Sequence, residues 1–140
     1  MSTRSPRASE VEKPVRTRAR WSITGGEPSL QEDLVPFIQK IRKLGFAVKL
    51  DTNGSRPDVI ARLFEDNLLD FIAMDVKAPA EKYRNVVKAP VETDAVCESI
   101  RLVTSAKIPH EFRTTVVETL LTPQDILAIA REIKGAKRYA

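Results

Sequence analysis

Short strand-like runs alternate with helix-length amphipathic segments along this chain of 140 residues. The predicted strands cover 21–24, 46–50, 71–76 and 112–117. The spacing of apolar residues predicts helices over 32–44, 57–67, 94–106 and 123–135, and a loop with a turn of helix over 79–92. Strands that alternate with helices are joined by right-handed crossovers, so this order predicts an α/β fold with a parallel sheet. Four strands cannot close an eight-stranded parallel barrel, which needs about 250 residues, and we therefore expect a partial barrel.

Polar residues follow each predicted strand at its carboxyl end. The first strand leads into Gly25, Gly26, Glu27 and Pro28, the second into Asp51, Thr52 and Asn53, and the third into Asp75 and Lys77, while Arg113 lies within the fourth. The carboxyl ends of parallel strands meet at one edge of a sheet, which is where ligands bind in such folds. The sequence therefore predicts one site built from these residues.

The residue types at this edge suit a ligand that carries both charges. Lys77 and Arg113 can bind a carboxylate, and Glu27 can accept from an ammonium group. Asp51 and Asp75, with neighbouring backbone carbonyls, can hold a hard cation through oxygen. Paired glycines let a ligand approach the backbone closely. These features predict a site for a zwitterion such as an amino-acid moiety.

Simpler interpretations of each cluster stay open. The Asp51–Gly54 segment has the composition of a polar turn, and Asp75 with Lys77 can form an exposed ion pair that contributes little to stability. A phosphate-binding α/β enzyme is a third interpretation. However, the loop that contains Gly25 and Gly26, called the glycine loop below, lacks the Lys-Ser/Thr pair that a P-loop requires.

The net positive charge of the chain comes from its first twenty residues. They contain six basic and two acidic residues, a net charge of +4, which equals the net charge of the whole chain. Residues 1–20 show no hydrophobic period, so we predict a disordered basic tail over 1–20 and a folded domain over 21–140. The folded domain is then neutral, which gives nucleic-acid binding little support.

The apolar residues and the single cysteine limit the remaining classes. No apolar run approaches the roughly 20 residues that span a membrane. Cys97 is the only cysteine, which excludes an internal disulfide and fits a reducing compartment, so we expect a cytoplasmic protein. Its place beside the apolar face of a predicted helix is typical of a buried small hydrophobic residue.

Three ordered motifs, taken together, resemble the radical S-adenosylmethionine superfamily. They are Thr24-Gly25-Gly26-Glu27-Pro28, Leu50-Asp51-Thr52-Asn53-Gly54 and Met74-Asp75-Val76-Lys77-Ala78, separated by helix-length segments. Within the superfamily the likeness is to activating enzymes of glycyl-radical proteins, of the anaerobic ribonucleoside-triphosphate reductase and pyruvate formate-lyase types. The resemblance implies reductive cleavage of S-adenosylmethionine and a glycyl radical formed on a partner enzyme.

The resemblance also assigns roles to the residues of the predicted site. It implies that Gly25, Gly26 and Glu27, with Pro28, Thr52 and Asn53 beside them, bind S-adenosylmethionine, and that Lys77 and Arg113 bind its carboxylate. It implies a monovalent-cation site formed by Asp51, Thr52, Ala73 and Asp75. These roles agree with the zwitterion site inferred from the residues themselves.

One element of the family pattern is absent from these 140 residues. The family binds a 4Fe–4S cluster through cysteines spaced Cys-x3-Cys-x2-Cys upstream of the first motif, where this chain has its basic segment and no cysteine. A single thiolate cannot hold such a cluster. We therefore expect an incomplete barrel that lacks its first β-α unit and its C-terminal end and is inactive in radical formation. Whether the chain is an enzyme stays open, and a non-catalytic module that binds S-adenosylmethionine or a partner protein is the alternative.

Overall fold

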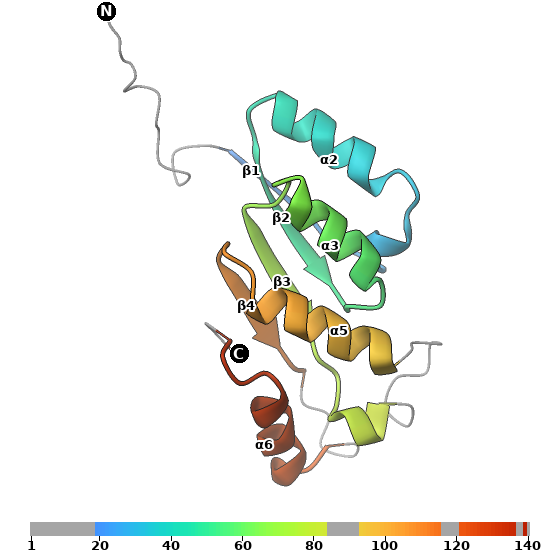
Figure 1. The fold of residues 1–140 in the computed structure, drawn as a ribbon, viewed down its shortest axis with the longest axis vertical. Coiled ribbons are helices and arrows are strands. Elements are labelled where there is room, and N and C mark those ends of the chain that lie inside the picture. The colour runs from blue at the N-terminus through green and yellow to red at the C-terminus, as the bar shows by residue number, and fades with distance from the viewer. Residues whose placement is uncertain (1–18, 84–92, 116–120, 137–138, 140) are drawn as a thin grey trace, which may run out of the picture.

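A four-stranded parallel sheet forms the centre of the molecule (Figure 1). The computed structural model describes residues 19–83, 93–115, 121–136 and 139, so most of the predicted tail lies outside the described residues. The strands are β1 (Arg20–Ile23), β2 (Ala47–Thr52), β3 (Phe71–Asp75) and β4 (His110–Arg113), and they lie in the order β1-β2-β3-β4. All three strand pairings are parallel, as the sequence predicted.

Helices connect the strands. They are α2 (Leu34–Lys43), α3 (Pro57–Glu65), α5 (Thr93–Thr104) and α6 (Pro123–Glu132), with short 3-10 turns η2 (Pro28–Leu30) and η3 (Ala80–Lys82). Helices α2, α3 and α5 lie on the same face of the sheet, and α6 lies beside β4 (Figure 1). None of the helices in these described segments is long and apolar enough to cross a bilayer.

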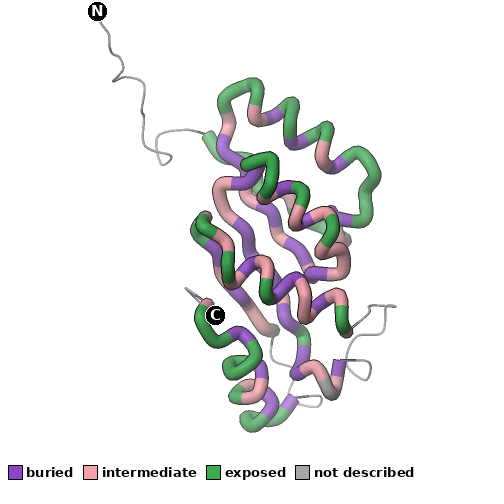
Figure 2. The backbone as a smooth tube through the Cα atoms, in the orientation of Figure 1, coloured by how far each residue is buried: buried purple, intermediate pink, exposed green. Residues whose placement is uncertain are grey.

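The two faces of the sheet differ sharply in chemistry. The face that the helices cover presents the fully buried side chains of Val48, Leu50, Ile72, Met74 and Phe112. The opposite face presents Lys49, Phe71, Asp51, Ala73, Asp75, Glu111 and Arg113, which the strand register aligns with one another. Figure 2 shows how burial concentrates in the strands and in the inner sides of the helices. Each fully buried aliphatic side chain stabilises the fold by about 1.5–3 kcal/mol.

Several predicted element boundaries are shifted. Strand β2 continues through Asp51 and Thr52, which the sequence placed after the strand, and β4 ends at Arg113 instead of 117. A 3-10 turn at 28–30, which was not predicted, follows the glycine loop. Tyr139 forms an isolated parallel bridge with Phe112. The shifts occur because pairing with a neighbouring strand, rather than local apolar pattern, decides where a strand ends.

A capping box begins α6, and separate contacts join this helix to the 3-10 turn after β3. The Thr122 hydroxyl accepts from the Asp125 amide, and the Asp125 carboxylate accepts from the Thr122 amide at 2.8 Å. Lys82 Nζ lies 2.8 Å from Asp125 Oδ2, and the Ala80 amide donates to the Glu132 carboxylate. These contacts attach α6 to the segment that follows β3.

The Asp125 carboxyl should make the stability of the protein depend on acid pH. The ammonium of Lys82, with the capping hydrogen bonds of Thr122, lowers the pKa of Asp125 below its ordinary value of 3.8. A lowered folded-state pKa contributes stability above the unfolded value, and that stability is lost as pH falls through the folded value. We expect Asp125→Asn to lower the thermal midpoint at pH 7 and to have a progressively smaller effect at an acidic pH below 3.8. An equal loss at both pH values would contradict this account.

Candidate functional site

The residues predicted from the strand ends do meet in one cleft at the carboxyl edge of the sheet. The cleft has a volume of about 140 Å³ and is lined by Thr24, Gly26, Glu27, Asp51, Thr52, Asn53, Asp75, Lys77 and Arg113. Gly25 lines an adjoining cavity of about 520 Å³ between the glycine loop and the start of α2. Pro28, which is buried, lines that same cavity, whereas the buried Ala73 lines neither. The edge therefore gathers three carboxylates and two cations in a small volume.

Glu27 connects the glycine loop to the end of β2. Its Oε2 accepts from the Thr52 hydroxyl at 2.6 Å, from the Ser29 amide at 3.1 Å and from the Ser29 hydroxyl. Its Oε1 accepts from the Asn53 amide at 2.6 Å. Each carboxylate oxygen offers about two acceptor positions, and Oε1 makes one hydrogen bond, so Oε1 keeps capacity for one further donor. The side chain both holds the glycine loop to β2 and lines the cleft.

The two glycines before Glu27 adopt backbone angles that other residues avoid. Gly25 has φ of +84° and Gly26 has φ of +45°, and a Cβ added at either position would meet no atom within 4 Å. Glycine is therefore required here by the turn of the backbone and not by crowding. The open space beside these two residues leaves Gly25 accessible from the adjoining cavity and Gly26 accessible from both the cavity and the cleft.

Arg113 lies between the two aspartates of the cleft. Its Nη2 is 3.7 Å from Asp51 Oδ2, and its Nε is 3.4 Å from Asp75 Oδ1. The guanidinium, which comes from β4, the strand next to that of Asp75, thus offsets part of the charge of the two carboxylates. The region that the sequence assigned to a monovalent cation already contains this fixed positive charge. Across the described part of the chain, no group of three or more Asp, Glu, His or Cys residues is arranged to hold a metal ion.

Two charged residues of this face were missed by the sequence analysis. Lys49 Nζ lies 3.6 Å from Asp51 Oδ1 and 5.5 Å from the ring centroid of Phe71. Glu111 Oε2 lies 4.0 Å from Arg113 Nε. Both precede a predicted site residue by two positions on the same strand, and this period of two places them on the same face. That alternation was the signal that could have identified them.

Lys77 is the exposed cation of the cleft. It follows β3 by two residues, and its ammonium has no ion-pair partner among the residues that the structure describes. Arg113, by contrast, is shared between carboxylates. Of the two cations that line the cleft, Lys77 is therefore the more available to an anionic group.

Cys97 lies outside the cleft, on α5. It is a half-buried free thiol, and burial raises its pKa above the ordinary value. A raised pKa disfavours the thiolate that binds iron. One such thiol does not fit a cluster that requires three cysteine ligands, so the residues of this chain do not form a 4Fe–4S site.

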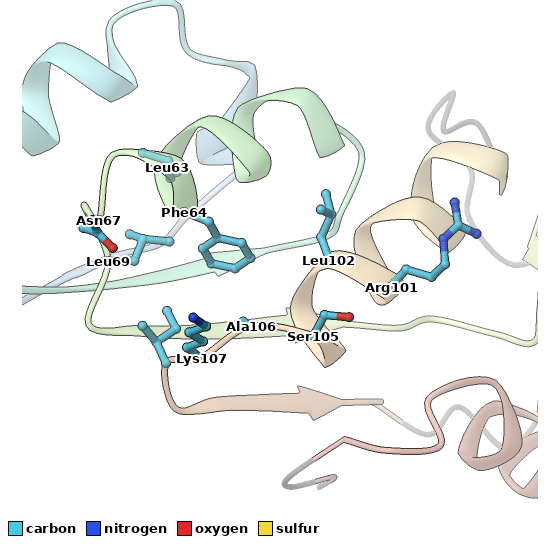
Figure 3. Close-up of a pocket in the computed structure, with 10 residues that line it drawn as sticks. Leu63, Phe64, Asn67, Leu69, Arg101, Leu102, Ser105, Ala106 and Lys107 are labelled. Carbon is cyan, nitrogen blue, oxygen red and sulfur yellow. The ribbon is translucent and has the colours of Figure 1, made fainter.

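A cavity larger than either the cleft or the cavity that adjoins it lies elsewhere in the molecule (Figure 3). It has a volume of about 620 Å³ and lies between the C-terminal parts of α3 and α5, where Leu63, Phe64, Leu102 and Ile108 line it. Asn67 and Lys107, also in its wall, precede β3 and β4, so this cavity faces the amino end of the strands. It contains no carboxylate and is separate from the polar cleft.

Sequence comparison decides the family. The model of the radical SAM superfamily matches residues 8–133. The chain belongs to this superfamily. A Methanocaldococcus jannaschii protein named "Putative glycyl-radical enzyme activating enzyme" is 38% identical over 123 residues, which cover 84% of this chain and 51% of the relative. This radical SAM chain therefore spans about half the length of that relative.

Other relatives of the chain carry different names. A 7-carboxy-7-deazaguanine synthase of Methanopyrus kandleri is 40% identical over 73 residues, covering 51% of this chain and 28% of the relative. The solved structure of a domain of pyruvate-formate lyase-activating enzyme from Bacteroides vulgatus superposes with a TM-score of 0.70 at 19% identity. That match covers 86% of this chain and 75% of the other and supports the radical SAM fold. The names diverge, so membership of the superfamily does not fix the reaction.

Proposed function

We propose that this chain provides the S-adenosylmethionine-binding part of an activating protein for a glycyl-radical enzyme. The observation that carries the proposal is the convergence of Glu27, Asp51, Asp75, Lys77 and Arg113 on one cleft beside the glycine loop. One relative is named for this activity, and the match covers 84% of this chain. That name supports the choice of a glycyl-radical enzyme as the partner.

Each group has a chemical role in this proposal. Lys77 and Arg113 bind the methionyl carboxylate, and the remaining acceptor position of Glu27 receives the methionyl ammonium. The backbone at Gly25 and Gly26 lies against the ligand. Asp51 and Asp75 orient Arg113 through the contacts at 3.7 and 3.4 Å. Paired in this way, the aspartates leave the cleft with a fixed cation at its base.

The family implies an iron–sulfur cluster that supplies the electron for cleavage of S-adenosylmethionine. This chain has one cysteine, so the cluster does not fit its residues. Radical formation by these 140 residues alone is therefore not part of the proposal. Their contribution is to bind and orient the amino-acid end of the ligand.

Replacement of Lys77 by methionine tests the ligand site. Isothermal titration with S-adenosylhomocysteine, which carries the same amino-acid end, should show binding by the wild type and a loss of about tenfold in affinity for Lys77→Met. Lys43→Met removes an equally exposed charge from α2, outside the cleft, and should leave affinity unchanged. No binding by the wild type, or equal losses in the two variants, would refute the assignment.

A second function, a non-catalytic module that binds S-adenosylmethionine or a partner protein, is favoured by the single cysteine. The two functions share the cleft, and both are stated for residues that hold no cluster. Anaerobic reconstitution with iron and sulfide tests that shared premise, because both functions predict that the chain retains neither. Stoichiometric iron and sulfide in the purified chain would exclude the module and would require ligands other than three cysteines of this sequence.

A further inference from the structure

Two hydroxyl groups hold the peptide unit that joins Val76 to Lys77. The Thr114 hydroxyl donates to the Val76 carbonyl oxygen at 2.7 Å. The Lys77 amide donates to the Tyr83 hydroxyl at 3.3 Å. The carbonyl and the N–H of one planar trans peptide point in opposite directions, so the two hydroxyls fix its orientation from both sides. This unit leads directly into the exposed lysine of the cleft.

Further hydrogen bonds surround this peptide. The Val76 amide donates to the Arg113 carbonyl at 2.8 Å, and Thr114 Oγ1 lies 2.7 Å from the Tyr139 hydroxyl. A hydroxyl has one hydrogen, and that of Thr114 is given to Val76, so Tyr139 is the donor to Thr114. Two separate segments of the chain therefore bind this peptide, and Tyr139 supports one of them through Thr114.

Tyr83 is well suited to this contact. Its side chain is 2% exposed, and it directly follows the turn η3 that also anchors α6. Burial, with a smaller contribution from Asp75, raises the pKa of the hydroxyl above its ordinary value, so the group stays neutral. A neutral phenol can accept the amide hydrogen of Lys77 throughout the range in which the protein is folded.

We propose that Tyr83 and Thr114 are positioning residues that orient Lys77 toward the cleft beside Arg113 and so set the affinity for the carboxylate of the ligand. The proposal rests on the function proposed above and extends it to two residues that line neither the cleft nor the adjoining cavity. Both act through the peptide that precedes the Lys77 side chain.

Two ligands separate positioning from general stability. S-adenosylhomocysteine carries the amino-acid carboxylate, and 5′-methylthioadenosine has the same adenosine and sulfur without it. Tyr83→Phe and Thr114→Val each remove a hydroxyl and keep the shape of the side chain. By calorimetry, we expect each variant to weaken S-adenosylhomocysteine binding by about threefold to tenfold and to leave 5′-methylthioadenosine binding unchanged. In a Lys77→Met background neither change should weaken binding further.

Thr104→Val is the matched control, because the Thr104 hydroxyl is buried and has no hydrogen-bond partner among the described residues. It should leave both affinities unchanged. Equal weakening of both ligands, or no weakening of either, would overturn the positioning role while leaving the ligand site intact. A wild type that binds neither ligand would overturn the proposed function and this inference together.

Discussion

Replacement of Gly54 by alanine should destabilise the protein by about 2–5 kcal/mol. Gly54 has φ of +77°, and a Cβ there would lie 2.2 Å from Met74 Cε and 3.2 Å from Ser99 Cβ. The left-handed backbone costs an alanine about 1–2 kcal/mol, and overpacking of the core adds about 1–3 kcal/mol. Urea unfolding monitored by circular dichroism measures the loss.

Gly26→Ala is the matched control for this prediction. Gly26 also has a positive φ, of +45°, but no atom lies within 4 Å of the position that an added Cβ would occupy, so only the backbone cost applies. We expect it to lower stability by about 1–2 kcal/mol. Equal losses in the two variants would show that Met74 and Ser99 move aside at no cost.

A substitution at Gly54 should also disturb the cleft, because hydrogen bonds connect Gly54 to it. Its carbonyl accepts from the buried Ser99 hydroxyl at 2.7 Å, and its amide donates to Thr52 Oγ1 at 3.1 Å. Thr52 in turn donates to Glu27. Helix α5 therefore supports the cleft through a continuous series of hydrogen bonds, and Gly54→Ala should weaken ligand binding as well as folding.

The sequence was sufficient for the architecture and for the location of the cleft. Apolar periodicity identified the strands that carry Asp51, Asp75 and Arg113, and parallel pairing then required their carboxyl ends to meet at one edge. The parallel direction of the strands followed from the same alternation. These features depend on local pattern and on the handedness of crossovers, and both can be read from one sequence.

The contacts that fix the site could not be read in this way. The hydrogen bond from Ser99 to Gly54 joins residues 45 positions apart, and that from Thr114 to Val76 joins residues 38 apart. Such pairs carry no local period, because they depend on how a helix or a neighbouring strand is seated on the sheet. Glu27 illustrates the difference between residue type and long-range contacts. As a carboxylate it was predicted to accept from an ammonium group, whereas its contacts show that it also holds β2.

Glu27→Ala should have the second large effect, because it affects folding and binding together. The carboxylate accepts four hydrogen bonds from Ser29, Thr52 and Asn53. Hydrogen bonds to a charged group contribute about 1.5–3 kcal/mol each when buried, and this site is half-buried, so we expect a total loss of about 2–4 kcal/mol. Affinity for S-adenosylhomocysteine should fall below detection in the same variant.

Glu27→Gln distinguishes the two roles of the side chain. Its amide keeps one acceptor oxygen, so part of the connection to β2 survives, while the charge that an ammonium requires is lost. We expect Glu27→Gln to recover at least half of the stability lost in Glu27→Ala and to bind ligand as poorly. Glu32→Gln, an exposed position outside the cleft, controls for the loss of charge. Full stability in Glu27→Ala would show that the carboxylate serves the ligand alone, whereas restored binding in Glu27→Gln would show that its role is to hold the glycine loop against β2.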